Sequence, residues 1–480
     1  MQNDKRAEMK LITTRPQFDN DLKDEIRLFF PTEQFENDDV TIEHFSNSFE
    51  KMTDTCVIKI GNKVVAKEEV SFDLPPKCTK LYETKLLKRN AKCAVYLALS
   101  KWQNKIMPWG TLTGIRPTRL AHELIEDGVP EHLIKETLMK SFYVSEKKAE
   151  IVAKIIKNQR CIIKNDNLID IYINIPFCPT RCQYCSFISS EYSRVEKQIP
   201  QFVDSLIKEI REMKKLIFRR ALVVRTIYIG GGTPTTLSAE DLSKILDELS
   251  YPVTEFTVEC GRPDTITKEK LDVLKAHGVT RICINPQSFN DKTLKQIGRG
   301  HTTKDIISAY ALALGYDFVI NMDLIAGLPG EKFAHFKKTI DSTLELAPQN
   351  ITIHTLALKN GAMLKTQNET NHFDADIEKM VDYGYKKMCE NGYVPYYMYR
   401  QKSMINNLEN IGYAQPNTIC LFNIDTMEET CSVLACGAGA ISKRIYNLEN
   451  RIERAANVKN LNDYINRIDE MIERKNNLFN

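Results

Sequence analysis

Short apolar runs alternate with longer amphipathic stretches through the middle of the chain, from about residue 170 to residue 360. Six runs have the length and the branched or aromatic content of β-strands: 171–175, 224–230, 256–259, 281–285, 318–327 and 351–358. Helical periodicity marks stretches between them, including 199–215, 239–249, 268–277 and 303–314. Strands that alternate with helices predict a parallel sheet, and six such units predict an α/β fold with an incomplete (β/α)6 barrel.

The patterns on either side of this alternation differ from it. On the N-terminal side, β-rich runs at 56–60 and 63–72 flank the turn Gly61-Asn62, which predicts a hairpin, and helical periodicity follows to about residue 160. The C-terminal part has a helix, an aromatic run and a charged helical tail, too short for a barrel of its own. We therefore expect three domains: an α+β N-terminal domain at 1–165, the partial barrel at 166–378 and a small C-terminal capping domain at 379–480.

Length and charge narrow the class of protein. At about 150 residues per domain, 480 residues are enough for two or three domains. The chain is 42% hydrophobic and 27% charged, and its 66 basic and 63 acidic residues nearly cancel, which excludes a disordered chain or a nucleic-acid-coating tail. The charged first residues lack the apolar core of a signal peptide, and no run approaches the ~18 apolar residues of a membrane span. We expect a cytoplasmic protein with no nucleic-acid partner.

Thirteen cysteines in a chain without an export signal point to a reducing compartment, where thiols stay free unless they bind metal or do redox chemistry. Ten are scattered among apolar or ordinary neighbours and are expected to be small buried hydrophobes: Cys56, Cys78, Cys93, Cys161, Cys260, Cys283, Cys389, Cys420, Cys431 and Cys436. The other three, Cys178, Cys182 and Cys185, fall within eight residues and are the candidates for metal chemistry.

The three clustered cysteines follow the first predicted barrel strand, at the strand end where barrel enzymes place their active sites. A closed zinc site needs four ligands, and no fourth Cys or His lies close by in the sequence. Three thiolates can instead hold a [4Fe–4S] cluster and leave one iron open to a small molecule. Three cysteines clustered by chance, or a zinc loop completed by a distant residue, are the alternatives.

A glycine-rich loop ends the second predicted strand and reads Gly230-Gly231-Gly232-Thr233-Pro234-Thr235. Residues without a side chain let backbone groups approach a ligand closely, and Thr233 adds a hydroxyl. Alone, such a loop is as often a plain turn. Because it comes one βα unit after the cysteines, it indicates a ligand site at this end of the barrel.

The spacing CxxxCxxC after the first barrel strand resembles that of the radical S-adenosylmethionine (SAM) superfamily. The motifs IPFC, GGGTPT, INPQSFN, IGRGHT and MDLIAGLPGE, between about 170 and 360, resemble the oxygen-independent coproporphyrinogen III oxidase family. GRPDTIT, YYMYRQK and GAGAISK are similar to its coproporphyrinogen dehydrogenase branch, which has an N-terminal extension of this size. One departure is Phe187, where the best-known oxidases have a further cysteine that does not bind the cluster.

The resemblance implies a [4Fe–4S] cluster on Cys178, Cys182 and Cys185, and one or two molecules of SAM. For the SAM bound to the cluster, the matching positions are Tyr172, Gly231 and Glu259. For a second SAM they are Tyr184, Gly232, Thr233, Gln287, Arg299, Asp323 and Ala357. The expected catalytic residues are Tyr172, Glu259 and Arg299. These side chains suit their roles, because carboxylates accept hydrogen bonds from ribose hydroxyls and an arginine donates two to a carboxylate.

The implied reaction is the oxidative decarboxylation of coproporphyrinogen III to protoporphyrinogen IX in porphyrin and haem biosynthesis, by a 5′-deoxyadenosyl radical that abstracts hydrogen from two propionates. It requires an electron donor for the cluster and a terminal electron acceptor. A substrate with four carboxylates needs cations, and its pyrroles need aromatic faces. The candidates are Arg262, Arg299, Arg400 and Lys402, with Tyr396, Tyr397 and Tyr399. Core packing is the alternative for the tyrosines.

The same barrel and motifs occur in haem-binding chaperones and in radical SAM methyltransferases that act on tetrapyrroles, so the fold does not separate these three functions. A chaperone needs an axial ligand for haem iron near the barrel mouth, and His301 and His354 are candidates. A structural histidine with satisfied hydrogen bonds is the simpler interpretation of each. The motifs favour the oxidase.

Overall fold

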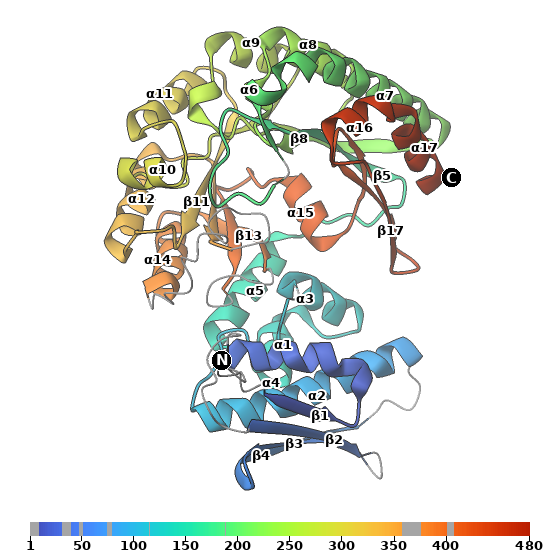
Figure 1. The fold of residues 1–480 in the computed structure, drawn as a ribbon, viewed down its shortest axis with the longest axis vertical. Helices are drawn as coiled ribbons and strands as arrows, with labels where there is room; N and C mark the ends of the chain where they lie inside the picture. Colours follow the sequence, from blue (N-terminus) through green and yellow to red (C-terminus); the bar gives the residue numbers. More distant parts are fainter. Residues whose placement is uncertain are drawn as a thin grey trace, which may run out of the picture. The chain divides into compact units, whose positions relative to one another are not determined.

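The computed structural model describes residues 9–30, 40–47, 51–73, 79–114, 116–187, 189–357, 376–400 and 408–480. Its contacts divide the chain into two compact units, Met1–Ala153 and Lys154–Asn480 (Figure 1). The barrel strands and the segment 379–480 therefore share one unit. The expected three-domain division stays a prediction.

The first unit is an α+β fold on a four-stranded sheet in the order β1-β2-β3-β4. β1 (Lys10–Thr13) pairs parallel with β2 (Val40–Asn47). β3 (Met52–Ile60) and β4 (Lys63–Phe72) form the expected hairpin around Gly61, whose φ of +55° suits a glycine. Its helices are α1 (Asp19–Phe29), α2 (Lys80–Gln103), α3 (Pro117–Glu126) and α4 (Ile134–Phe142), and α5 (Glu146–Asn158) contains the boundary between the two units. Apolar side chains of α1, α2 and the sheet form the core of this unit.

The second unit contains an eleven-stranded sheet in the order β13-β14-β12-β11-β10-β9-β8-β5-β15-β16-β17. Six adjacent parallel strands form the partial barrel: β5 (Leu168–Ile175), β8 (Val223–Gly231), β9 (Glu255–Val258), β10 (Arg281–Cys283), β11 (Val319–Ala326) and β12 (Asn350–Thr355). Each lies within a few residues of a predicted strand. The α/β class and the incomplete six-stranded barrel are confirmed.

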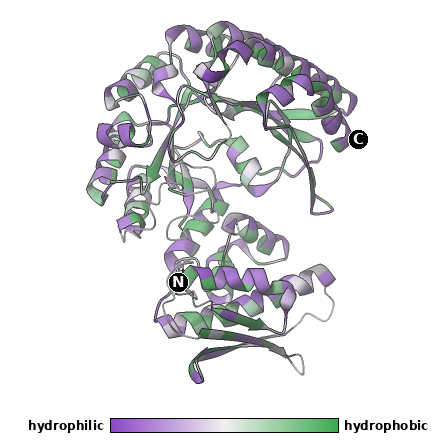
Figure 2. Ribbon diagram, viewed as in Figure 1, coloured by the Kyte–Doolittle hydropathy of each residue, from purple (hydrophilic) through white to green (hydrophobic). Residues whose placement is uncertain are grey.

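Helices between the barrel strands follow the outer side of the sheet in Figure 1. They are α7 (Ile199–Arg219), α8 (Ala239–Asp247), α9 (Lys268–Ala276), α10 (Asp291–Gln296), α11 (Thr303–Leu314) and α12 (Phe333–Leu346). In Figure 2 the barrel strands are mostly apolar, whereas the helices show both apolar and polar residues. The apolar side of α7, with Phe202, Leu206 and Ile210 fully buried, packs into the main core.

The C-terminal segment extends the barrel sheet at both of its edges. β14 (Asn410–Ala414) pairs antiparallel with β12, and β13 (Val394–Tyr399) lies beyond it. At the other edge, β15 (Ser432–Cys436) pairs parallel with β5 and is followed by β16 (Ile441–Tyr446) and β17 (Arg451–Ala456). The helices of this segment are α14 (Asp376–Glu390), α15 (Leu421–Glu428), α16 (Leu461–Asn466) and α17 (Ile468–Leu478).

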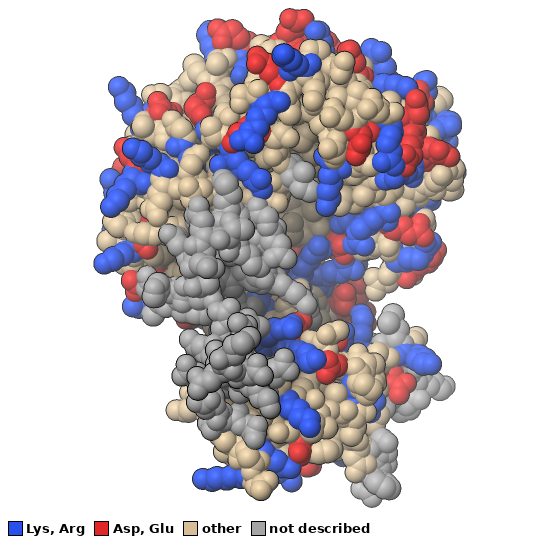
Figure 3. Space-filling view, in the orientation of Figure 1, with Lys and Arg blue, Asp and Glu red and all other residues tan. Residues whose placement is uncertain are grey.

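The surface of the described residues carries charges of both signs. Lys and Arg side chains lie among Asp and Glu side chains on the face drawn in Figure 3, in keeping with the formal net charge of +3. Within the described ranges, no helix combines the length and the apolar character needed to cross a membrane.

Candidate active site

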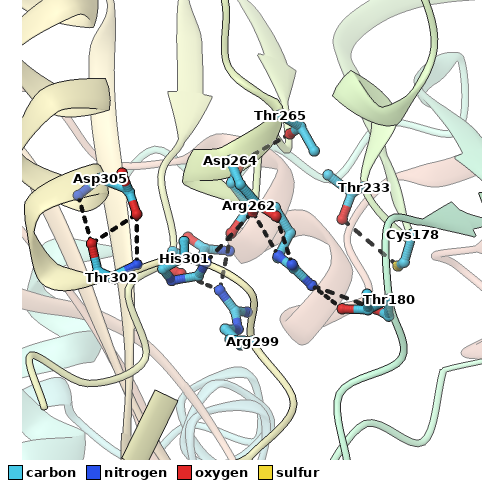
Figure 4. A network of polar contacts seen from close by, with 12 residues as sticks. Cys178, Thr180, Thr233, Arg262, Asp264, Thr265, Arg299, His301, Thr302 and Asp305 are labelled. Carbon is cyan, nitrogen blue, oxygen red and sulfur yellow. Dashed lines mark hydrogen bonds and ion pairs between the residues drawn. The ribbon is translucent and has the colours of Figure 1, made fainter. Parts of the chain in front are cut away.

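The three clustered cysteines lie on the loop that follows β5, at the carboxyl ends of the barrel strands. β6 (Phe177–Cys178) begins this loop and pairs with β7 (Ser190–Glu191). The Thr233 hydroxyl donates to the Cys178 sulfur at 3.7 Å (Figure 4), and the N–H of Gln183 donates to the Ile297 carbonyl at 3.0 Å. All three thiols are partly exposed and line one cavity of about 370 Å³. The barrel therefore presents three sulfur donors to a common space.

The arrangement of these sulfur atoms fits a cluster better than a single ion. They do not all lie within 4.8 Å of one another, as ligands of one ion would, whereas each thiolate of a [4Fe–4S] cluster binds a different iron. Burial raises the pKa of Cys178 and raises the pKa of Cys185 to about 11. Thiolates at these positions therefore need a bound cation, which the iron of a cluster supplies.

The glycine loop at the end of β8 packs against the segment that carries Cys178. Gly231 has a φ of +108°, which favours glycine, and a Cβ on Gly232 would collide with the Phe177 backbone. The N–H of Thr233 donates to the Phe177 carbonyl at 2.6 Å. Gly231, Gly232 and Thr233 of this loop also line the cavity. The glycines thus let this loop pack against the cysteine segment. The sequence alone did not show this reason for glycine at these positions.

Arg299, expected to bind a carboxylate of SAM, already donates to protein groups. Its guanidinium donates to the carbonyls of Asn285 and Gly261 at 2.5 and 3.3 Å and to the Tyr184 hydroxyl at 3.0 Å. Because Tyr184 lies between Cys182 and Cys185, Arg299 holds the cysteine loop in place. Both residues line the cavity.

Arg262 is also engaged, by groups that Figure 4 shows around it. It donates to both oxygens of Asp264, at 2.9 and 2.7 Å, and to the Thr180 hydroxyl at 3.0 Å. His301 Nδ1 lies 3.5 Å from Asp264, and His301 does not line the cavity. The position of His301 favours a structural role over haem ligation.

Glu259 follows β9 directly and faces the cavity. It accepts a hydrogen bond from the Tyr228 hydroxyl at 2.5 Å. Burial raises the pKa of Glu259 to about 7, against a smaller lowering by this hydrogen bond. The carboxyl group can therefore change its protonation state near neutral pH.

Tyr172, expected beside Glu259 in the SAM site, does not line the cavity. Its ring lies 6.2 Å from the ring of Tyr228 and 6.0 Å from the ring of Phe422 in α15, in a stack of three aromatic residues. Its hydroxyl donates to Asn174 at 3.2 Å. In this structure Tyr172 therefore supports Tyr228, and a contact between Tyr172 and SAM stays a prediction.

Asp323 in β11 is the second carboxylate of the cavity. It accepts a hydrogen bond from Asn321 at 2.8 Å, and His354 Nε2 lies 3.8 Å from it. His354 Nδ1 lies 3.2 Å from the Tyr399 hydroxyl. Burial raises the pKa of Asp323, but the contacts with His354 and Asn321 outweigh it and hold the pKa below its usual range. Asp323 is thus a carboxylate that stays ionised.

Gln287 and Ala357 lie on the cavity wall, as expected. Gln287 has a φ of +65°, and its backbone bonds to the β11 residues Asp323 and Ile325 at 2.9 and 3.0 Å. Its side-chain Oε1 is buried and has no hydrogen-bond partner among the described residues. A strained backbone that turns an unsatisfied amide toward a cavity suits ligand binding.

The proposed substrate contacts divide into three groups. Tyr397 and Tyr399 line the cavity, whereas Tyr396 does not and is 1% exposed, which is core packing. Arg400 is buried. Lys402 lies outside the described residues.

Sequence reasoning missed several cavity residues, among them Arg281, Tyr228, Cys283 and Cys420. Cys283 and Cys420 are buried, as expected of scattered cysteines, but they also border the cavity. Cys161 and Cys389 are only partly buried, contrary to that expectation, and Cys78 lies outside the described residues. A clue for Cys283 was its place in a barrel strand, two residues before Asn285 of the cavity wall.

Comparison with known proteins places this geometry in a family. The radical SAM superfamily model matches residues 172–343. The "Oxygen-independent coproporphyrinogen-III oxidase-like protein HemZ" of Bacillus subtilis is 37% identical over 81% of this chain and 80% of its own length. "Heme chaperone HemW" of Bacillus subtilis is 34% identical over 39% of this chain and 50% of its own length. The solved coproporphyrinogen III oxidase HemN of Escherichia coli shares the fold, with a TM-score of 0.51 and 21% identity over 66% of this chain and 73% of that chain.

The partial barrel and its cysteine loop thus define a radical SAM protein. Within that superfamily, the chain belongs to the family of oxygen-independent coproporphyrinogen-III oxidase-like proteins. Radical SAM proteins use a [4Fe–4S] cluster and SAM, and the three cysteines that hold such a cluster are present here.

Proposed function

We propose that the protein is an oxygen-independent coproporphyrinogen III oxidase of the dehydrogenase branch, which forms protoporphyrinogen IX in haem biosynthesis. The observation that carries the proposal is one cavity lined both by the three cysteines and by the carboxylates Glu259 and Asp323. Similarity to the oxidase-like relative over four fifths of both chains supports it. The twelve cysteines within the described residues form no disulfide, which fits a reducing, cytoplasmic location.

The residues of the cavity have distinct tasks in this reaction. When bound, the cluster and SAM supply a 5′-deoxyadenosyl radical, which removes hydrogen from a C–H bond. Cys178, Cys182 and Cys185 would hold the cluster. Glu259 and Asp323 can accept hydrogen bonds from ribose hydroxyls, and the ionised Asp323 attracts the positive charge of SAM. The free amide oxygen of Gln287 can accept from the SAM ammonium group.

Tyr228, Tyr397 and Tyr399 line the same cavity and offer ring faces to pyrroles. Their bulk keeps water away from the C–H bond to be broken. Each propionate loses one hydrogen atom to the adenosyl group, one electron to an acceptor and carbon dioxide, which leaves a vinyl group. The proposal therefore includes an electron donor for the cluster and a terminal acceptor.

A haem-binding chaperone is the second candidate function. His354 lines the cavity, with Nδ1 3.2 Å from the Tyr399 hydroxyl and Nε2 3.8 Å from Asp323, so haem ligation through Nε2 would replace its contact with Asp323. Similarity to the haem chaperone HemW over part of the chain is the other support.

Anaerobic turnover separates these functions. The reconstituted protein, given coproporphyrinogen III, SAM, a reductant and an electron acceptor, is expected to release 5′-deoxyadenosine, carbon dioxide and a divinyl product. Stoichiometric haem binding without porphyrinogen turnover would favour the chaperone, and a methylated tetrapyrrole would favour a methyltransferase.

The variants Asp323→Asn and His354→Ala sharpen the test. The oxidase proposal expects Asp323→Asn to weaken SAM binding and turnover while cluster iron is unchanged. The exposed Asp247→Asn, whose carboxylate lies 3.1 Å from His277 and does not line the cavity, is the matched control and should behave as wild type. A chaperone predicts that His354→Ala lowers haem affinity, with no product formed by either protein.

A further inference from the structure

The amino ends of the barrel strands carry a buried cluster that is separate from the cavity. Asp170 lies near the start of β5, Asp425 lies in α15, and Cys431 directly precedes β15. One oxygen of each carboxylate and the Cys431 sulfur all lie within 4.8 Å of one another. The aspartates have no exposed surface, Cys431 is 1% exposed, and none of the three lines the cavity.

The oxygen atoms of this cluster are only half satisfied. Thr226 donates to Asp170 Oδ1 at 2.6 Å, and Thr430 and Arg225 donate to Asp425 Oδ1 at 2.6 and 3.2 Å. The Oδ2 atoms of both aspartates are buried and have no hydrogen-bond partner among the described residues. Buried carboxylate oxygens require a donor or a cation, so the cluster lacks a positive group or a proton.

A neighbouring carboxylate at the same end of the barrel is fully satisfied. Glu255 Oε2 accepts from Arg281 and from the N–H of Leu421, both at 3.1 Å. Glu255 Oε1 accepts from the Cys420 thiol at 3.1 Å and the N–H of Phe422 at 3.4 Å. The chain's own groups thus satisfy both oxygen atoms of a buried carboxylate here, whereas Arg225 reaches only one oxygen of Asp425, and Thr226 donates to only one oxygen of Asp170.

Charge and donor type identify the missing group. Two carboxylates and a thiolate carry three negative charges, and Arg225, which donates to Asp425 and lies 3.8 Å from the Cys431 sulfur, supplies one positive charge. A divalent cation brings the sum to zero. Zinc accepts this mixture of sulfur and carboxylate ligands, and a second oxygen of either aspartate can complete four donors.

We propose that Asp170, Asp425 and Cys431 bind one zinc ion at the amino ends of the barrel strands. The ion joins the first barrel strand to α15 and to the segment before β15, and its role is structural. It is distinct from the cluster, which lies at the opposite ends of the strands. The site does not depend on the function proposed above.

Metal analysis of the anaerobically purified holoprotein tests the site. We expect one zinc ion per chain in addition to the cluster iron. Cys431→Ser and Asp170→Asn should lose the zinc and keep the iron and the visible absorbance of the cluster. Cys436→Ser is the matched control, because it replaces another buried thiol near β15, whose sulfur lies 3.6 Å from that of Met213, and it should keep the zinc.

Measurements on the wild-type protein cover the case in which the variants fold poorly. Holoprotein grown with Co²⁺ in place of zinc should show thiolate-to-cobalt absorption beside the cluster bands. A zinc content that Cys431→Ser leaves unchanged, or a zinc-free wild type without cobalt absorption, overturns the site. So does a carboxylic-acid band in the infrared spectrum that disappears in Asp170→Asn, because a shared proton would then hold the pair.

Discussion

Two buried carboxylate sites of the barrel are satisfied in opposite ways. At the amino end of β9, Glu255 is paired with Arg281 at 3.1 Å, and both of its oxygen atoms accept hydrogen bonds. At the carboxyl ends, Glu259 and Asp323 face the cavity, and no arginine within the described ranges forms an ion pair with either. Their donors there are a tyrosine, an asparagine and a histidine.

This difference separates stability from ligand binding. A guanidinium that saturates a carboxylate stabilises the fold but competes with any ligand for the same oxygen atoms. Neutral donors leave lone pairs free, so Glu259 and Asp323 can accept from a ligand. Two of the arginines that line the cavity, Arg262 and Arg299, bond to the protein and hold the cysteine loop. Substitutions at the carboxyl ends of the strands should therefore impair cofactor binding, whereas substitutions at Glu255 and Arg281 should lower the free energy of unfolding.

The largest effect is expected from Cys182→Ala. Two remaining thiolates cannot hold a cluster by three corners, so the variant should lose the cluster iron, its brown absorbance and all SAM cleavage. Iron and sulfide analysis with electron paramagnetic resonance measures this. Cys260→Ser, at a buried thiol that does not line the cavity, should retain the cluster. Retention of the cluster in Cys182→Ala would refute the ligand assignment.

Arg281→Met should mainly affect stability, because Arg281 pairs with Glu255 at the amino ends of the strands, although its side chain also lines the cavity. It leaves the buried Glu255 without its ionic partner, which typically lowers the free energy of unfolding by about 3–5 kcal/mol. Urea denaturation measures the change, and the folded protein should keep its cluster. Arg211→Met is the control, because Arg211 pairs with Glu248 on the surface and is 63% exposed, so a loss of about 0–1 kcal/mol is expected. Equal losses in both variants would contradict the comparison.

Gly232→Ala tests the contact between the glycine loop and the cysteine segment. The added methyl group collides with the Phe177 backbone, which should displace Cys178 and lower the free energy of unfolding by about 1–3 kcal/mol. Cluster occupancy after reconstitution should fall in parallel. Gly315→Ala is the control, because its Cβ would meet only the Leu312 carbonyl, at 3.6 Å. Full occupancy in Gly232→Ala would show that the two loops are not coupled.

The smallest effect is the pH dependence of Glu259. Its folded-state pKa, about 7, lies above the ordinary 4.5, so the folded protein binds this proton more tightly than the unfolded chain. The stability from this group is therefore present below pH 4.5 and is lost as the pH rises through 7, by at most about 1.4 kcal/mol per pH unit. Urea denaturation across this pH range should show that the free energy of unfolding declines less steeply in Glu259→Gln than in the wild type.

The control for that profile is Glu248→Gln. Partial burial raises the pKa of Glu248, but hydrogen bonds from Arg211 and Lys214, at 2.9 and 3.0 Å, outweigh this effect and lower the pKa below its ordinary value. The stability that Glu248 contributes is lost as the pH falls. Glu248→Gln should therefore show the same decline in the free energy of unfolding between pH 4.5 and 7 as the wild type. A wild-type curve that is flat over this range would contradict the assignment of Glu259.

Local sequence patterns predicted much of the fold and the cysteine loop. Short apolar runs between helical stretches placed all six barrel strands, and the spacing of Cys178, Cys182 and Cys185 indicated the cluster. These features depend on residues within a few positions of one another. The contact of Tyr228 with Glu259 and the stack of Phe422 on Tyr172 were not predicted, because residues 31 and 250 positions apart meet only in the folded chain.

By itself, the sequence determined which segments become strands and which thiols are near one another, since side-chain alternation and short spacing are local properties. Only the tertiary structure decided that 379–480 extends both edges of the sheet, that Arg262 and Arg299 are already occupied, and that Asp170, Asp425 and Cys431 meet. Long-range pairing depends on the summed packing of the whole barrel, which no window of sequence contains.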